Sequence, residues 1–372
     1  MRHSVHMARQ VAVEHGETYL SLFTASMGWC QGEDMATIKD VARLAEVSVS
    51  TVSNVANNAK FVSEPLRQKV LKAMKRLDYR ANNAARSLRG KGSGSIAFMV
   101  SDITIPFFAE VLRGMEKSAS EHNYNIIICS TDGNIRKEEA YIGMLREKII
   151  DGVIVSSIRG NIEENRHISQ LIDDGIPVLV IDRAIKGLHA PSVTIDNKNA
   201  AKEAVSYLIS LGHRKIGFIS GDLLIGINRD RLDGYKEALL EANINYDRFM
   251  LREGRDFSVE TGYETGLSLL AAANAPTAIL TVNDILALGV SYAIHEYDLQ
   301  IPSDISLIGF DDIPISRFFT PPLTTVAQPM REMGREAFKL LHRCIIGKGW
   351  SDEKSIVLPT KLEIRRSTGT PR

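Results

Sequence analysis

Cysteine is scarce in this sequence, and the three cysteines show no sign of a metal site. Cys30, Cys129 and Cys344 are odd in number and lie far apart, without the paired spacing of zinc ligands. This usage fits reduced thiols in a cytoplasm. Long apolar runs are also missing, so no segment is predicted to cross a bilayer. We therefore expect a cytoplasmic protein with no membrane partner and no metal.

The sequence also lacks the motifs of common enzyme classes. It contains no P-loop, no H-E-x-x-H zinc motif and no G-x-S-x-G nucleophile elbow, and His295-Glu296 lacks the second histidine. Gly92, Gly94 and Ala97 have the spacing of a dinucleotide-binding loop. That loop follows a strand, however, whereas this run precedes an apolar segment. We predict no enzyme activity and no cofactor; a sugar kinase with an Asp-rich cleft is the enzymatic alternative.

Residues 36–57 show the pattern of a helix-turn-helix. Apolar residues recur at helical spacing on two short segments separated by a turn at 46–48. Thr37 can cap the first helix, with Asp40 three residues later completing a capping box, and Ser48 can cap the second. A third amphipathic helix is predicted from Ser63 to about Leu77. One face of each helix is apolar: Ile38, Val41, Ala42, Ala45, Val47, Val52, Val55, Leu66, Val70, Ala73, Met74 and Leu77.

The outward residues of the second helix suit the bases of DNA. A recognition helix lies in the major groove with its N-terminal residues at the base edges. Asn54 can bond adenine, and the methyl groups of Val49 and Thr51 can meet thymine methyls. Residues 35–92 carry 12 Lys/Arg against 4 Asp/Glu, a net +8 in a chain of formal charge zero, as expected of a phosphate-binding segment. Short Ser/Thr-rich helical pairs in ordinary globular proteins are the alternative.

From residue 95 onward, short apolar runs alternate with amphipathic helices, and the pattern restarts after Asp196. Such alternation specifies parallel sheets covered by helices. Two successive sets predict two α/β lobes with a cleft between them. The predicted strands are 96–100, 126–129, 153–155, 178–181, 216–220, 278–282 and 306–310, and the predicted helices begin near 107, 136, 162, 200, 229, 259 and 285.

Ligands of open α/β sheets bind beyond the carboxyl ends of the strands. That rule selects residues 102–108, 182–183, 283–284 and 311–312, with Arg231 and Phe257 in or near loops on the same side. Asp, Asn and Arg can bond the hydroxyls of a sugar, and Phe can pack on its C–H surface. Two alternatives stay open: Asp182, Asn283 and Asp311 could cap the helices that follow, and Phe107 and Phe108 could be core residues.

Several segments, in order, resemble the lactose-repressor (LacI/GalR) family of bacterial transcription regulators: MATIKDVARLA, VSVSTVSNV, FVS, RSLRG, GHRKIGFISG, SLIGFDD and TPPLTTVAQP. The resemblance implies an all-α helix-turn-helix DNA-binding domain and an α/β two-lobed, periplasmic-binding-protein-like effector domain with parallel sheets. Members usually begin close to the first motif, so Met35 is the predicted native start. The implied parts are an extension at 1–34 that is either not native or disordered, the headpiece at 35–81, a hinge helix and linker at 82–94, the two-lobed domain at 95–366 and a tail at 367–372.

The resemblance also implies residue roles. The hinge helix would press Leu88 into the minor groove while Arg86 holds phosphate. The predicted DNA contacts are Thr37, Ser48, Val49, Ser50, Thr51, Ser53, Asn54, Asn57, Arg86 and Leu88. The predicted effector contacts are Phe107, Phe108, Asp182, Arg183, Arg231, Phe257, Asn283, Asp311 and Gln328. Glu46 departs from the glycine common in the turn, and Ile105 from the asparagine common in ribose-type binders, which puts ribose in doubt.

Together these features predict a sequence-specific repressor of a carbohydrate-utilisation operon. We expect a homodimer on double-stranded operator DNA, nucleoid-associated in the bacterial cytoplasm, with operator affinity controlled by a monosaccharide-like effector. The alternative effectors are a sugar acid, a sugar phosphate and a purine. An alternative class of protein is a free-standing sugar receptor. The chain ends shortly after Arg366 without leucine heptads, which argues against a C-terminal zipper.

Overall fold

The computed structural model describes residues 36–57, 61–79, 92–147, 150–156, 165–183, 187–347 and 355–372. The chain divides into two units, Met1–Asn83 and Ala84–Arg372. The predicted extension at 1–34, Arg86 and Leu88 lie outside the described residues. Among the residues that are described, no helix is long and apolar enough to cross a membrane.

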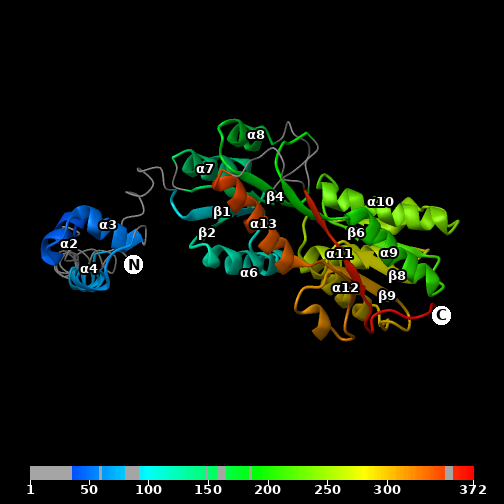
Figure 1. Cartoon of the computed structure of the whole chain (residues 1–372). Helices are drawn as coiled ribbons and strands as arrows, with labels where there is room; N and C mark the ends of the chain where they lie inside the picture. Colours follow the sequence, from blue (N-terminus) through cyan, green and yellow to red (C-terminus); the bar gives the residue numbers. More distant parts are fainter. Residues whose placement is uncertain are drawn as a thin grey trace, which may run out of the picture. The chain divides into compact units, whose positions relative to one another are not determined.

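The described part of the first unit contains three short helices around one small core (Figure 1): α2 Ile38–Ala45, α3 Val49–Asn57 and α4 Glu64–Arg76. The capping box predicted at Thr37 and Asp40 is present, and Ser48 Oγ accepts a hydrogen bond from Thr51 N–H at the start of α3. Val41, Val52 and Val70 are fully buried in the core. Leu66 is exposed rather than buried, contrary to the expectation from helical spacing.

Lobe 1 of the second unit is built on a six-stranded parallel sheet of order β11-β5-β4-β3-β1-β2. Its strands are β1 Ser95–Val100, β2 Asn125–Ser130, β3 Val153–Val155, β4 Val178–Asp182, β5 Ser192–Ile195 and β11 Ile356–Leu358. Its helices are α6 Pro106–Glu121, α7 Ile135–Arg146, α8 Arg166–Asp173 and α13 Met330–Ile345. In Figure 1, α13 lies along this sheet beside α6.

Lobe 2 is built on a second six-stranded sheet of order β12-β10-β9-β8-β6-β7. Its strands are β6 Ile216–Ser220, β7 Leu251–Glu253, β8 Ala278–Thr281, β9 Ser306–Asp311, β10 Thr324–Ala327 and β12 Lys361–Glu363. Its helices are α9 Asn197–Ser210, α10 Gly226–Glu241, α11 Val259–Leu270 and α12 Asp284–Glu296, with 3-10 turns η1 Arg248–Met250 and η2 Ser316–Phe318. The described strand pairs of this sheet are parallel except for the edge pair β10–β12.

The chain passes between the lobes three times, where the sequence pattern suggested one division at Asp196. It crosses from β5 to α9, returns from β10 to α13, and crosses again from β11 to β12. Lobe 1 therefore contains a helix and a strand from the last quarter of the chain. The pattern missed β11 because this strand is only three residues long and pairs with a strand far away in the sequence.

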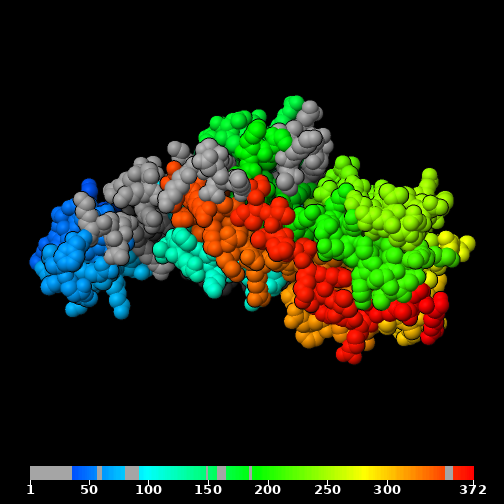
Figure 2. All heavy atoms as spheres, turned by 45° about the vertical axis from the view of Figure 1, so that its right-hand side comes forward, coloured from blue at the N-terminus to red at the C-terminus, as the bar shows by residue number. Residues whose placement is uncertain are grey.

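Residues 367–369, which we assigned to a separate tail, belong to lobe 2. Ser367 bonds the backbone of Leu307 in β9 through both its carbonyl and its hydroxyl, and the carbonyl of Gly369 accepts a hydrogen bond from buried His213. In the space-filling view the red C-terminal segment lies against green atoms of the second unit (Figure 2). Sequence patterns did not indicate this packing, because such a short polar segment has no apolar period.

Candidate functional site

The predicted DNA-reading residues lie on and before α3. Thr37, Ser48, Val49 and Ser50 are exposed, and Thr51, Ser53 and Asn54 are half-buried. Ser48 Oγ lies 2.7 Å from Ser50 Oγ and 2.8 Å from Thr51 Oγ1, so these hydroxyls are held together at the start of the helix. Asn57 lies at the end of α3, with its side chain outside the described residues.

Glu46 ends α2 in the left-handed conformation, with φ 52° and ψ 45°. This is the conformation that glycine adopts without steric cost, so the departure from glycine keeps the turn and strains the residue. The Glu46 carboxylate accepts a hydrogen bond from Lys69 Nζ of α4 at 2.9 Å. The turn with Glu46 in place of glycine therefore gains a hydrogen bond to the third helix.

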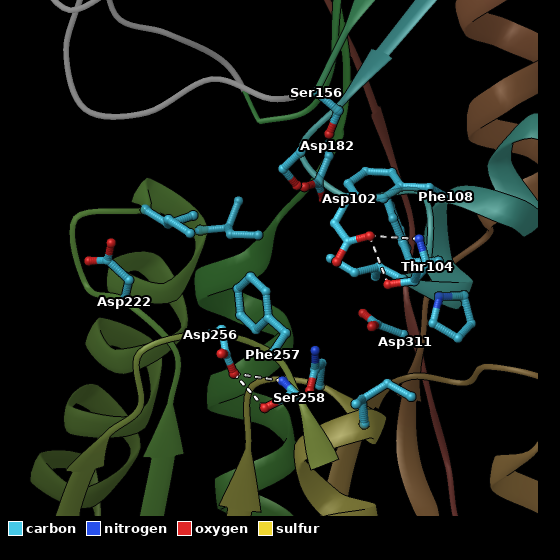
Figure 3. A pocket seen from close by; sticks show the side chains of 18 of the residues that line it. Asp102, Thr104, Phe108, Ser156, Asp182, Asp222, Asp256, Phe257, Ser258 and Asp311 are labelled. Carbon is cyan, nitrogen blue, oxygen red and sulfur yellow. Dashed lines mark hydrogen bonds between the residues drawn. The ribbon is translucent and has the colours of Figure 1, made fainter. Parts of the chain in front are cut away.

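In the second unit, a cavity of about 520 Å³ lies between residues of the two lobes, beyond the carboxyl ends of the strands. All nine predicted effector contacts line it: Phe107, Phe108, Asp182, Arg183, Arg231, Phe257, Asn283, Asp311 and Gln328. Figure 3 shows Asp182 and Phe108 on one side of the space and Phe257 and Ser258 on the other. The strand-end rule and the family resemblance together thus selected cavity residues that are up to 221 positions apart.

Arg231 is buried and fixed on three sides. Its Nε donates to Asn197 Oδ1 at 2.8 Å, its Nη1 donates to the carbonyl of Val282, and its guanidinium carbon lies 3.6 Å from the centroid of the Phe310 ring. Nη1 also lies 4.0 Å from Asp311 Oδ1. Sequence reasoning missed Asn197, which is the first residue of α9 after the chain leaves lobe 1. Arg231 also lines the cavity, so a ligand there would meet a guanidinium that is fixed in place.

Asp182 and Asp311 end β4 and β9 with positive φ, 76° and 110°. Asp tolerates this region better than most residues, and such strain is often found at functional sites. Burial raises the pKa of both carboxyls, well above the ordinary value for Asp311, while Arg231 opposes the shift. Asp311 also accepts a hydrogen bond from Gln328 Nε2 at 2.7 Å. This hydrogen bond holds the Asp311 carboxyl in place at the cavity wall, which Asp182 also lines.

The structure separates the two alternatives that the sequence left open. Asn283 does cap a helix, because its Oδ1 accepts from Leu286 N–H at 2.8 Å, and its side chain lines the cavity as well. Asp182 and Asp311 cap none of the described helices. Phe107 and Phe108 are both buried core residues and part of the cavity lining. The capping and core explanations thus account for some of these residues without excluding a ligand.

The cavity has further lining residues that we did not select. Asp132 and Gly133 follow β2, Ser156 follows β3, and Asp222 follows β6. The strand-end rule applies to each of these positions and would have found them. The described part of the chain shows no group of three or more His, Cys, Asp or Glu that could hold a metal ion.

A helix-turn-helix unit followed by two α/β lobes around a polar cavity defines the class: a DNA-binding transcription regulator with a periplasmic-binding-protein-like domain. The model of bacterial regulatory proteins of the lacI family matches residues 37–82, and that of the periplasmic binding protein-like domain matches residues 205–368. The chain belongs to the lacI family. It is a DNA-binding transcriptional repressor and not an enzyme, which confirms the fold and family predicted from the sequence.

Known relatives match most of the length of this chain. The HTH-type transcriptional repressor PurR of Vibrio atlanticus is 39% identical over 311 residues, which are 82% of this chain and 91% of that protein. The ribose operon repressor of Haemophilus influenzae is 37% identical over 337 residues, 90% of this chain and 98% of that protein. The crystal structure of the Lac repressor dimer bound to operator and the anti-inducer ONPF is 28% identical, with TM-score 0.81, and the match covers 90% of this chain and 99% of that one.

Proposed function

We propose that the protein represses a carbohydrate-utilisation operon and that a neutral, polyhydroxylated effector in the cavity controls its affinity for operator DNA. The carrying observation is the convergence of Arg231, Asp182, Asn283, Asp311 and Gln328 on one cavity. Bidentate and amide groups of this kind suit vicinal hydroxyls. As in the Lac repressor structure, the DNA-bound form would be a homodimer on an operator, which two α3 helices would read.

Two buried polar atoms support a ligand that both donates and accepts hydrogen bonds. Gln328 Oε1 and Ser156 Oγ are buried without a hydrogen-bond partner in the described chain, and both residues line the cavity. Buried polar groups are normally satisfied, so a bound hydroxyl-rich molecule would complete them. We therefore propose that all nine residues predicted from the sequence contact the effector.

The charge of the lining favours a neutral ligand over a sugar acid or sugar phosphate. Six aspartates line the cavity against three arginines: Asp102, Asp132, Asp182, Asp222, Asp256 and Asp311, with Arg183, Arg231 and Arg255. An added anion would meet this excess of carboxyl groups. A purine is the second candidate, because the half-buried ring of Phe257 presents a flat face for stacking.

A thermal-shift screen of the full chain tests the effector. The panel contains D-ribose, D-glucose, D-gluconate, D-ribose 5-phosphate and hypoxanthine. A ligand at 100 times its Kd stabilises the protein by ~2.7 kcal/mol, which a melting curve resolves. We expect stabilisation by a neutral sugar. Stabilisation by hypoxanthine or by the anions alone would replace the proposed effector class.

Selection of binding sites from random double-stranded DNA tests the reading head. Asn54→Ala should weaken binding to the selected site by tenfold or more, since a good bidentate base contact contributes ~1–3 kcal/mol. Gln68→Ala is the matched control, because Gln68 is exposed on α4 and bonds Glu64. Equal binding by both variants would remove Asn54 from the reading surface.

A further inference from the structure

Two of the helices that begin at the cavity have an isoleucine at the N-cap, whereas α11 and α12 are capped there by Ser258 and Asn283. Ile105 is the N-cap of α6 in lobe 1 and Ile225 is the N-cap of α10 in lobe 2, with φ/ψ of −70°/116° and −77°/119°. Neither side chain makes a cap hydrogen bond. Ser, Thr, Asp and Asn are strongly preferred at this position because they bond the free N–H groups of the first turn. Each lobe thus keeps an apolar residue where its helix would be more stable with a polar one.

The isoleucines belong to an apolar part of the cavity lining, which we call the apolar rim. It consists of Ile105, Ile225, Ile227, Val259 and Ile285, all of them half-buried. Within the described chain, only Ile105 among them packs against a hydrophobic core cluster. The apolar surface of the others therefore meets the cavity rather than the interior. Departures from local sequence preference, such as an isoleucine at a helix N-cap, are expected at functional sites.

The apolar rim differs chemically from the buried polar set that includes Arg231, Asn283 and Asp311. A ligand made only of hydroxyl groups would satisfy the polar set and leave the rim in contact with water or with unpaired hydroxyls. A ligand that also carries an apolar group would cover both parts. From this we infer that the effector is an amphiphilic sugar, a polyhydroxylated ring with an apolar substituent such as the methyl of a 6-deoxyhexose or the aryl group of a glycoside.

This inference rests on the proposed function, and matched sugars test it on the full chain. Isothermal titration compares L-fucose with L-galactose, L-rhamnose with L-mannose, and phenyl β-D-glucoside with D-glucose. The members of each pair differ at one carbon: the 6-hydroxyl group is replaced by hydrogen in the first two pairs, and the anomeric hydroxyl group carries a phenyl group in the third. We expect the apolar member of at least one pair to bind tenfold or more tightly than its partner, the range that one buried methyl or larger apolar group contributes.

The outcomes separate the inference from the proposed function. If hydroxylated members bind as tightly as their apolar partners, or more tightly, the sugar effector stands and the amphiphilic class is overturned. If no sugar of either kind binds while hypoxanthine does, the sugar effector itself is lost, and the inference with it.

Variants at the rim decide whether these isoleucines recognise the ligand. Ile225→Ser should reduce the preference for the apolar member at least fivefold while raising the melting temperature, because serine supplies the missing cap. Leu224→Ser is the matched control: Leu224 is the adjacent residue, 68% exposed and not part of the lining, so the preference should not change. Ile105→Ser should lower the preference in the same way from the other lobe.

One other role for the rim gives a different result. The isoleucines of the two lobes would contact each other if the lobes closed, whatever ligand lay between them. In that case Ile225→Ser would weaken both members of a pair by the same factor and leave their ratio unchanged. That result would overturn the inference.

Discussion

Arg231 shows how one buried cation can be held for a ligand. Its contacts with Asn197, Val282 and Phe310 need a planar guanidinium with donors in fixed directions, which lysine cannot supply. Arg231→Lys should therefore weaken effector binding at least tenfold while changing operator affinity in the absence of effector by no more than about twofold. Titration calorimetry and operator gel shifts measure the two quantities.

Arg229→Lys is the control for this prediction. Arg229 is exposed, two residues earlier on α10, and donates to the carbonyls of Leu223 and Leu224. Its replacement should leave effector affinity nearly unchanged. If Arg231→Lys bound the effector as tightly as the wild type, the guanidinium would have no role in recognition.

Asp284 gives lobe 2 a pH dependence. Its buried carboxyl accepts hydrogen bonds from Ile313 N–H, Ser316 Oγ and Thr325 Oγ1, and burial nevertheless raises its pKa to about 7. The folded pKa exceeds the unfolded one, so the folded protein binds more protons between about pH 4 and 7. The stability contributed by the protonated carboxyl is complete below that window and is lost as the pH rises through 7.

Asp284→Asn removes this titration, and melting temperatures at pH 5, 6.5 and 8 check it. The wild type should lose about 3 kcal/mol of stability relative to the variant between pH 5 and pH 8, because only the part of the titration window above pH 5 is sampled. A wild type that gains on the variant instead would show that the three hydrogen bonds outweigh burial.

At the residue scale, the residues directly after the strands were easier to predict from the sequence than the residues that support them. Asp182, Asn283 and Asp311 were found because strand ends converge at one edge of a sheet. Asn197 was not, because its role depends on α9 and α10 packing side by side, and nothing local in the sequence records that contact. Ile225 was passed over because the rule looks for polar groups.

At the scale of elements, glycines set how closely α6 and α13 approach. A Cβ on Gly334 of α13 would lie 1.9 Å from the carbonyl oxygen of Val111 in α6, and a Cβ on Gly114 of α6 would lie 1.9 Å from that of Arg331 in α13. The two backbones are therefore in contact, and no side chain fits between them. Among the described helices of lobe 1, α6 comes first in the chain and α13 comes last. Their contact therefore packs the segment that returns from lobe 2 against the start of lobe 1.

Gly334→Ala should lower the free energy of unfolding by about 2–3 kcal/mol, since overpacking forces two rigid backbones apart. Gly143→Ala on α7 is the matched control, because nothing lies within 4 Å of its added Cβ. There alanine should raise stability by up to ~1 kcal/mol through its better helix propensity. Urea unfolding measures both; a Gly334→Ala variant as stable as Gly143→Ala would contradict the close contact.

Sequence periodicity predicted the helices and strands more reliably than it predicted which lobe each of them belongs to. Alternating apolar runs and helices indicated the α/β class and most strands, because each signal is local. The transfer of α13 and β11 to lobe 1 depends on pairing with β5 across more than 150 residues. Such long-range pairing leaves no periodic trace, so the three crossings were not predicted.

At the scale of the whole molecule, effector and operator binding must be linked reciprocally. If the effector changes operator affinity by a given factor, operator DNA changes effector affinity by the same factor, with ~5–150-fold as the usual range. Titration of effector into free protein and into the protein–operator complex measures this. Equal effector affinity in the free protein and in the operator complex would mean that the two binding sites are not coupled.

Leu88 is the residue through which the sequence predicts this linkage to reach DNA, and its role remains a prediction because it lies outside the described residues. An apolar side chain pressed between base steps kinks the duplex and widens the contact with protein. Leu88→Ala should therefore weaken binding to the selected operator at least tenfold, while effector affinity of the free protein stays the same because the cavity is untouched.

Ser87→Ala, one residue earlier, is the control and should bind operator normally. Unchanged operator affinity in Leu88→Ala would remove the wedge, and a parallel loss in both variants would assign the effect to the hinge backbone.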